Sequence, residues 1–256
     1  FKLGNQNMKI KIFFLLYFLC LSIYSQQFRT TSAIADLDQY YNNNGVAVAD
    51  YDQDGDLDIF LVSYHGGNNN SRLLENTNNG NFIDVTAATG INQNLNHEID
   101  LPSGFYFGDR LSASWGDFNN DGYPDLFLGN SVQSELYKNN GDGSFANITE
   151  SAGFQVSCDS CYITGALWLD YDLDGLLDIF LSDYYSDSPN KLYRNLGNET
   201  FELIDLSSVI ENANSFSAIN MYVNEDAYPD IYIANDFDQN NMLLINQEGS
   251  GFVNQA

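Results

Sequence analysis

The stretch Asp50-Tyr51-Asp52-Gln53-Asp54-Gly55-Asp56-Leu57-Asp58 organises the interpretation of the whole chain. Carboxylates stand at positions 1, 3, 5 and 9 of this stretch, glycine stands at position 6, and an apolar run from Ile59 to Val62 follows. Carboxylates this close repel one another, since a pair about 4 Å apart costs roughly 4 kcal/mol at an effective dielectric near 20. The stretch therefore predicts a loop that folds around a hard divalent cation.

Calcium fits this spacing better than magnesium, because calcium accepts six to eight oxygens in flexible geometry whereas magnesium prefers a rigid octahedron with retained waters. An EF-hand would need an acidic residue at position 12 and a helix on each side. Position 12 here is Leu61, within a β-rich apolar run that indicates a strand. We therefore expect a calcium loop inside a β-hairpin, with glycine 6 at positive φ. A solvated acidic turn without metal is the alternative.

The loop recurs along the chain. Two further copies are intact, at Asp117–Asp125 and Asp170–Asp178. A fourth copy, Tyr222–Asp230, is degenerate, because Tyr222 replaces the first aspartate and Ala227 replaces the glycine. Three intact copies in the same register favour metal binding over a plain acidic turn, and the fourth is expected to bind metal weakly or not at all.

Two more motifs recur in step with the loops. A strand of small residues, such as Gly45–Ala49, precedes each loop, and a Leu-x-x-Asn segment with a phenylalanine six residues after the asparagine follows it. The asparagines are Asn76, Asn139, Asn195 and Asn246. Turn formers fill the six-residue interval, as in a β-hairpin. Four antiparallel strands per repeat of about 50 residues are typical of a β-propeller blade, whereas a generic β-sandwich gives no reason for such regular repetition.

The sequence thus predicts an all-β fold, a β-propeller of four-stranded blades, as a partial open arc of a larger propeller. The expected divisions are an N-terminal extension with a signal peptide (1–25) and a propeller (26–256). The blades cover about 37–91, 92–153, 154–210 and an incomplete 211–256, and an outer closing strand covers 28–36. An insertion from Asn92 to Gly108 is either a binding loop or merely a tolerated one.

The net charge and the N-terminal residues limit the partners and the cellular location that this chain can have. Formal net charge is −26, and all 35 acidic residues follow residue 25. Nucleic acid and anionic membrane surfaces are therefore excluded as natural partners.

The basic start Met8–Lys11 and the apolar stretch Ile12–Ile23 predict a signal peptide that is cleaved after Ser25, and the apolar stretch is too short to span a bilayer. An uncleaved anchor and a lipoprotein signal at Cys20 are alternatives. Secretion makes a local disulfide the default for Cys158 and Cys161.

These motifs resemble the FG-GAP/VCBS repeat of integrin α-type propellers, and most closely its secreted cartilage acidic protein (ASPIC/UnbV-associated) branch. The resemblance covers about residues 28–256. It implies a propeller, typically seven-bladed, with calcium between the first two strands of each blade, and extracellular adhesion or ligand binding. The branch's C-terminal ASPIC/UnbV module is not visible in this sequence.

The resemblance also implies the calcium ligands. Side-chain ligands are expected at positions 1, 3, 5 and 9, and a backbone carbonyl at position 7. The implied residues are Asp50, Asp52, Asp54, Asp56 and Asp58; Asp117, Asn119, Asp121, Tyr123 and Asp125; Asp170, Asp172, Asp174, Leu176 and Asp178; and, in the degenerate loop, Asn224, Asp226 and Asp230.

Three functions remain open. The first is a secreted propeller, stabilised by structural calcium, that binds an extracellular protein or glycan. The second is the propeller domain of a secreted carbohydrate-active enzyme, although His65 and His97 have no recognisable nucleophile motif beside them. The third is a surface-display structural module. We expect no catalytic residues, and the sequence does not identify the ligand or the oligomeric state.

Overall fold

A computed structural model describes residues 43–63, 71–77, 80–91, 99–100, 106–107, 110–131, 134–154, 161–184 and 189–255. The predicted signal peptide and the predicted closing strand 28–36 lie outside these residues, as do His65, His97 and Cys158. Cys161 is described and is disulfide-bonded. Among the described residues, no helix combines the length and apolarity needed to cross a membrane.

Four four-stranded antiparallel sheets make up the fold, and in each sheet the strands pair in chain order. The first strands are β1 (Asn43–Ala49), β7 (Arg110–Gly116), β11 (Ile163–Leu169) and β15 (Ser215–Met221). The second strands are β2 (Asp58–Ser63), β8 (Asp125–Asn130), β12 (Asp178–Asp183) and β16 (Asp230–Asn235). The third strands are β3 (Arg72–Asn76), β9 (Glu135–Asn139), β13 (Lys191–Asn195) and β17 (Met242–Asn246). The fourth strands are β4 (Phe82–Asp84), β10 (Phe145–Asn147), β14 (Phe201–Ile204) and β18 (Phe252–Asn254).

The four sheets repeat in detail. Every first strand has a register shift, or β-bulge, near its start, at Asn43/Gly45, Arg110/Ser112, Ile163/Gly165 and Ser215/Ser217. Small residues follow each bulge, and they allow adjacent first strands to approach closely. The second strand of the second sheet is confined as well, since a Cβ added at Gly129 of β8 would lie 2.3 Å from Ser112 Oγ of its own sheet and 2.6 Å from the carbonyl oxygen of Ile163 in the third sheet. Glycine at this position is therefore required by packing both within its sheet and against the next.

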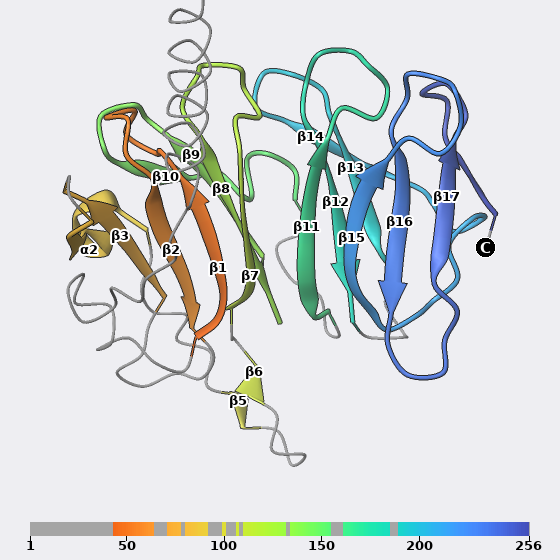
Figure 1. The fold of residues 1–256 in the computed structure, drawn as a ribbon, viewed down its shortest axis with the longest axis horizontal. Coiled ribbons are helices and arrows are strands. Elements are labelled where there is room, and N and C mark those ends of the chain that lie inside the picture. Colours follow the sequence, from red (N-terminus) through yellow and green to blue (C-terminus); the bar gives the residue numbers. More distant parts are fainter. Residues whose placement is uncertain are drawn as a thin grey trace, which may run out of the picture.

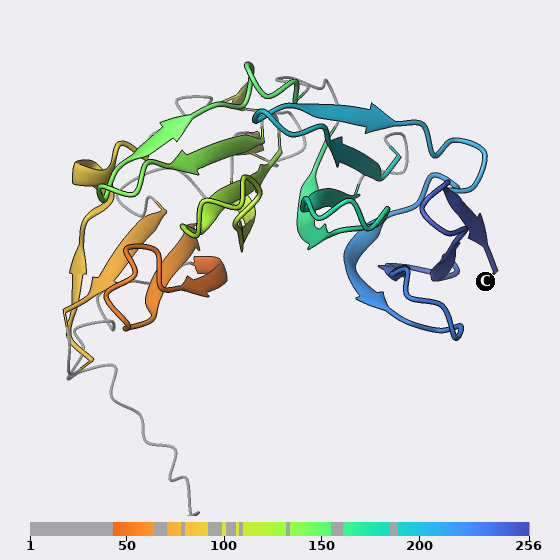
Figure 2. The same cartoon turned by 90° about the horizontal axis from the view of Figure 1, so that it is seen from above.

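The sheets stand side by side along an open arc, which is clearest when the molecule is seen from above (Figure 2). A separate hydrophobic core fills each space between neighbouring sheets. Phe60 of the first sheet shares one core with Tyr137 of the second, Phe127 of the second shares another with Tyr193 of the third, and Phe180 of the third shares the last with Leu244 of the fourth. Consequently β8 and β12, which lie between two cores, are buried along their whole length. The side chains on both faces of these two strands are therefore apolar or buried, because each face packs against a different core.

The prediction of an all-β fold built from four-stranded blades is confirmed. A helical turn, α2 (Thr86–Thr89), follows β4, and a two-stranded ladder of β5 (Ile99–Asp100) and β6 (Tyr106–Phe107) lies within the predicted insertion. The loops between the first and second strands of all four sheets lie at the same end of the arc, at the top of Figure 1. This end carries the acidic stretches.

Candidate metal centres in the acidic loops

The three intact loops share one backbone conformation. Their position 6 glycines, Gly55, Gly122 and Gly175, have φ values of 94°, 94° and 89°. Position 4 is also left-handed in all three loops, with φ near 60° at Gln53, Asn120 and Leu173. Such φ values favour glycine and, less strongly, asparagine. In the fourth loop neither Glu225 nor Ala227 has a positive φ, so this loop follows a different path.

The acidic side chains hold each loop closed through backbone N–H groups. In the first loop Asp50 Oδ2 accepts from Gly55 N at 3.1 Å, and Asp52 Oδ1 accepts from Asp54 N at 3.2 Å. Asp54 Oδ1 accepts in turn from Asp56 N at 2.9 Å. The second and third loops repeat this pattern. In the first loop Asp50 and Asp54 each use one oxygen for these bonds, whereas Asp117 and Asp170 use both, because each also accepts from the position 5 N–H at 3.1 Å.

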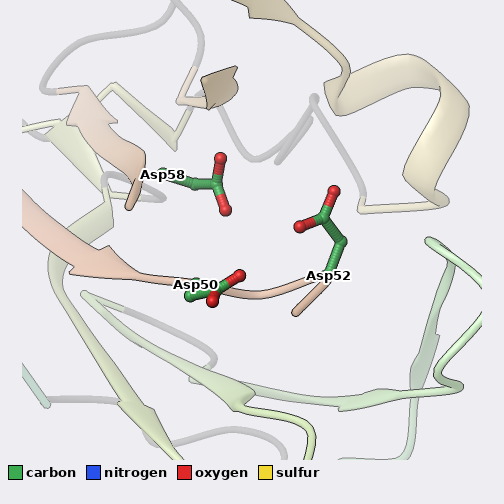
Figure 3. A group of neighbouring side chains, drawn as sticks. All are labelled: Asp50, Asp52 and Asp58. Carbon is green, nitrogen blue, oxygen red and sulfur yellow. The ribbon is translucent and has the colours of Figure 1, made fainter. Parts of the chain in front are cut away.

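Carboxylate oxygens of the first loop converge. The carboxylates of Asp50, Asp52 and Asp58 each offer an oxygen within 4.8 Å of the others, and the close-up shows the three groups facing a common space (Figure 3). Asp50 Oδ1 and Asp56 Oδ2 are buried without a hydrogen-bond partner. A buried unpaired carboxylate oxygen is costly unless a cation or donor satisfies it. The first loop therefore fits a metal ion that prefers oxygen ligands.

The third loop brings together a second triad. Oxygens of Asp170, Asp172 and Asp174 also lie within 4.8 Å of one another. Here an arginine of β13 already approaches, since Arg194 Nη2 lies 2.6 Å from Asp172 Oδ2 and 3.5 Å from Asp174 Oδ2. The guanidinium neutralises part of the negative charge that would otherwise attract an ion. This contact was not predicted from the sequence, because Arg194 is 20 residues after Asp174, in the Leu-x-x-Asn motif.

The second and fourth loops have an asparagine at position 3. Asn119 Nδ2 donates to Asp121 Oδ2 at 2.9 Å, and Asn224 Nδ2 donates to Asp226 Oδ2 at 2.6 Å. The amide thus satisfies an oxygen at position 5, whereas in the third loop the corresponding oxygen of Asp174 faces Arg194. In the fourth loop position 1 is Tyr222, which is 62% exposed and supplies no carboxylate. The predicted ligands of the fourth loop are consequently reduced to Asn224, Asp226 and Asp230, as the sequence indicated.

The aspartate at position 9 has a second role in all four loops. Asp58 is buried, and its two oxygens accept from Tyr51 N at 3.2 Å and Asn76 N at 2.8 Å. Asp125, Asp178 and Asp230 make the same two bonds in their own sheets. Position 9 therefore ties the loop to the third strand of its sheet even where the metal pattern is lost. A carboxylate oxygen can accept more than one interaction, so this role is compatible with metal ligation.

Burial perturbs the pKa values of the loop aspartates. Desolvation raises the pKa of Asp58 to about 6 and the pKa values of Asp125 and Asp178 to about 7, and the backbone N–H donors only partly oppose it. Burial likewise raises the pKa values of Asp52 and Asp172. Within the described part of the chain, every carboxyl group with a raised pKa belongs to an acidic loop. A bound cation would favour the ionised form and reverse these shifts.

The recurrent asparagine of the third strand links neighbouring loops. Asn139 Nδ2 donates to the carbonyl oxygen of Tyr51 in the preceding loop at 2.8 Å, while its backbone N–H donates to Asp125. Asn195 and Asn246 make the corresponding 2.8 Å bonds to Phe118 and Tyr171. An unbroken path of hydrogen bonds therefore connects all four loops, from Asp58 to Asp230. The sequence identified these asparagines as a repeat motif, but their cross-sheet role depends on the packing of the sheets.

Position 4 adds a second cross-sheet contact. Gln53 Nε2 donates to the carbonyl oxygen of Gly122, and Asn120 Nδ2 donates to that of Gly175 at 2.9 Å. Leu173 has no amide to continue the series.

The predicted backbone ligands at position 7 are Asp56, Tyr123 and Leu176, and each donates its backbone N–H to the position 5 side chain of its loop. Ligation by their carbonyl oxygens stays a prediction.

Comparison with known proteins agrees with this repeat. Residues 117–181 match the FG-GAP-like repeat family. Cartilage acidic protein 1 of Mus musculus is 27% identical over 169 residues, which is 65% of this chain and 24% of that protein. The Homo sapiens protein is also 27% identical over 169 residues, 65% of this chain and 23% of its own length. The chain carries an FG-GAP-like repeat and is distantly homologous to cartilage acidic protein 1, which confirms the resemblance, and it spans about a quarter of the length of these relatives.

Solved structures with a similar chain path include an Agrocybe aegerita lectin described as recognising non-reducing terminal N-acetylglucosamine. Its TM-score is 0.49 at 16% identity, over 84% of this chain and 52% of the lectin. A biofilm matrix protein of V. cholerae has a TM-score of 0.35 at 15% identity, over 81% of this chain and 38% of that protein.

Proposed function

Starting from the FG-GAP-like repeat and the distant homology to cartilage acidic protein 1, we propose that this chain is a secreted, calcium-stabilised binding module. Calcium in the intact loops is structural, and the assembled sheets present surfaces to an extracellular protein or glycan. The observation that carries the proposal is the first loop, where three carboxylates converge and Asp50 Oδ1 is buried without a partner. Extracellular calcium modules typically bind with dissociation constants of about 10⁻⁴–10⁻³ M.

Calcium supplies a positive charge that carboxylates can share. Asp50, Asp52, Asp54 and Asp58 would hold it in the first loop, and Asp170, Asp172, Asp174 and Asp178 in the third. The protein's own contribution is to preorganise these groups: left-handed residues turn the loop, and backbone N–H groups fix one oxygen of each side chain. A loop with bound calcium then holds together the first two strands of its sheet. Through the hydrogen bonds of the third-strand asparagine it also holds the neighbouring loop.

A structural role is preferred to catalysis. The described carboxyl groups with raised pKa values all lie in the loops, where the repeated geometry already accounts for them. An enzyme would instead be expected to place a perturbed acid or base in a cleft away from the metal loops. The same loop arrangement occurs in sheet after sheet. This repetition suits metal sites that each stabilise their own sheet better than it suits a single reaction centre.

Thermal unfolding with and without calcium tests the proposal. At a calcium concentration one hundred times the dissociation constant, each site adds about 2.7 kcal/mol to the free energy of unfolding. For a chain of this size we expect the melting temperature at neutral pH to rise by about 5 °C or more over the value in chelator. Circular dichroism or calorimetry on the full chain would measure it. An unchanged melting temperature would contradict the structural role.

Matched variants separate the sites from general charge effects. Asp50→Asn keeps a hydrogen-bond acceptor for Gly55 but removes the negative charge, so it should reduce the calcium-dependent rise. Asp142→Asn is the control, because Asp142 is an exposed aspartate of the β9–β10 hairpin whose Oδ1 accepts from Ser144 N at 3.0 Å. The control should retain the full rise. Equal loss in both variants would show that calcium acts through bulk charge alone.

The calcium effect should depend on pH. The folded, metal-free chain binds protons at Asp58, Asp125 and Asp178 more tightly than the unfolded chain, because burial raises these pKa values from 3.8 to about 6 or 7. Without calcium, the free energy of unfolding therefore falls as pH rises from about 4 to about 7. Calcium replaces the protons and offsets this loss. The difference in melting temperature between calcium and chelator should be larger at pH 7.5 than at pH 5, and an opposite trend would count against ligation by these carboxylates.

A further inference from the structure

An aromatic cluster lies at the end of the arc opposite the acidic loops. Tyr184, which follows β12, is central to it, with ring centroids of Tyr162, Phe216 and Phe237 at 6.1, 5.7 and 6.3 Å. Phe216 and Phe237 are 57% and 74% exposed. The cluster joins the third and fourth sheets at the lower end of Figure 1, where β12 and β16 end. Large apolar side chains grouped on a surface typically mark an interaction site.

Specific hydrogen bonds hold the aromatic cluster in place. Tyr184 Oη donates to Asp236 Oδ2 at 2.6 Å, and the carbonyl oxygen of Tyr184 accepts from Asn214 Nδ2 at 2.6 Å. Phe237 has a φ of 56°, and its N–H donates to Asp236 Oδ1 at 2.7 Å. A phenylalanine in the left-handed region is strained. The loop thus keeps the most exposed ring of the cluster beside Asp236 at a cost in backbone energy.

Two aspartates adjoin the exposed ring along the chain. Asp236 and Asp238 flank Phe237 in the sequence, and the hydrogen bond from Tyr184 lowers the pKa of Asp236 and keeps it ionised. Lys191 of β13 lies 3.2 Å from Asp183 and is already engaged there. Across the described ranges, no lysine or arginine forms an ion pair with Asp236 or Asp238. The ring faces and the uncompensated carboxylates favour the same kind of ligand, a cation with a flat apolar face.

We propose that this aromatic–acidic surface, formed by Tyr162, Tyr184, Phe216, Asp236, Phe237 and Asp238, binds an arginine-bearing segment of a partner protein. A guanidinium group stacks on an aromatic face and simultaneously pairs with a carboxylate, which an ammonium group does less well. The strongly acidic chain, with 35 acidic and 9 basic residues, would attract such a segment from a distance. The inference rests on the proposed binding function and specifies the chemistry of its partner.

The test uses the full chain saturated with calcium and a capped peptide, Gly-Arg-Gly-Arg-Gly, as the probe. Nuclear magnetic resonance titration at about 0.15 M salt, where distant charges are screened, reports binding site by site. Shifts should concentrate on the Tyr184, Phe216 and Phe237 rings, and the same peptide with neutral citrulline should bind far more weakly. Phe237→Leu keeps apolar bulk but removes the ring, so it should weaken binding by about 2- to 30-fold. Asp236→Asn should weaken it as well.

Tyr222→Leu is the matched control, because Tyr222 is 62% exposed and follows β15 at the other end of the same sheet. It should leave the peptide affinity unchanged. Equal binding of the citrulline peptide, or an unchanged affinity in Phe237→Leu, would overturn the proposal, and so would ring shifts caused by a neutral oligosaccharide but not by the arginine peptide. Phe237→Leu should keep the calcium-dependent rise in melting temperature, so a failure here is distinguishable from a failure of the calcium sites.

Discussion

The first and third acidic loops have nearly the same sequence and the same backbone, yet their surroundings carry opposite charge. The third-strand residue just before the recurrent asparagine is Glu75 in the first sheet and Arg194 in the third. Glu75 Oε2 accepts from Tyr51 Oη at 3.1 Å, and within the described residues no lysine or arginine pairs with the first triad, whereas Arg194 contacts Asp172 and Asp174. The two loops are thus matched in ligands and differ in the charge that a metal ion would meet.

This difference shows that a repeated motif does not guarantee repeated affinity. The loop residues determine whether oxygens converge, and a residue from another strand determines how much uncompensated charge they carry. Arg194 belongs to a separate motif and reaches the loop only because β13 pairs with β12. The variants below probe what the two loops share and what separates them.

The largest effect is expected where the loops are alike. Asp58→Ala and Asp178→Ala each remove a buried carboxylate that accepts two backbone N–H groups, so two buried donors lose their partners. Each variant should lower the free energy of unfolding by about 3 kcal/mol, in calcium and in chelator alike. Urea denaturation would measure it. A loss below about 1 kcal/mol in chelator would mean that position 9 serves the metal rather than the sheet.

A smaller effect should separate the two loops through their asparagines. Asn195 Nδ2 bonds Phe118 O at 2.8 Å and Leu177 O at 3.0 Å, whereas Asn76 Nδ2 makes one 3.3 Å bond, to Leu57 O, and its Oδ1 is buried without a partner. Asn195→Ala should therefore cost about 2 kcal/mol and Asn76→Ala about 0.5 kcal/mol in the same denaturation experiment. Equal losses would show that the cross-sheet bond contributes nothing measurable.

The smallest effect concerns the charge difference itself. Arg194→Gln removes the competing guanidinium and should tighten calcium binding by the third loop about five-fold, equivalent to about 1 kcal/mol. Calorimetric titration in a background of Asp50→Asn and Asp117→Asn isolates this site. Lys138→Gln is the control, because Lys138 pairs with Glu199 rather than with an acidic loop. Unchanged or weaker binding after Arg194→Gln would contradict the role given to Arg194.

Much of the candidate site followed from local sequence. The Asp-x-Asp-x-Asp-Gly spacing predicted the turn, the positive φ at glycine and the following strand, because each depends on a few neighbouring residues. The degenerate fourth loop was also recognisable from Tyr222 and Ala227. The pairing of Asn119 with Asp121 was harder to foresee, since an asparagine can offer either its oxygen or its nitrogen to a neighbour.

The repeat, the four-stranded unit and the convergence of acidic residues in one loop all follow from local sequence, because they depend on alternation, turn chemistry and charge spacing within about 50 residues. The connections between units, in contrast, depend on how the folded sheets pack. Asn139 reaches Tyr51, and Phe237 reaches Tyr184, because neighbouring sheets pack around shared apolar cores. Contacts of that kind depend on sheet-to-sheet geometry, which no stretch of sequence contains. The loop at Asp50–Asp58 was therefore readable in isolation, whereas its place in a connected series of loops was not.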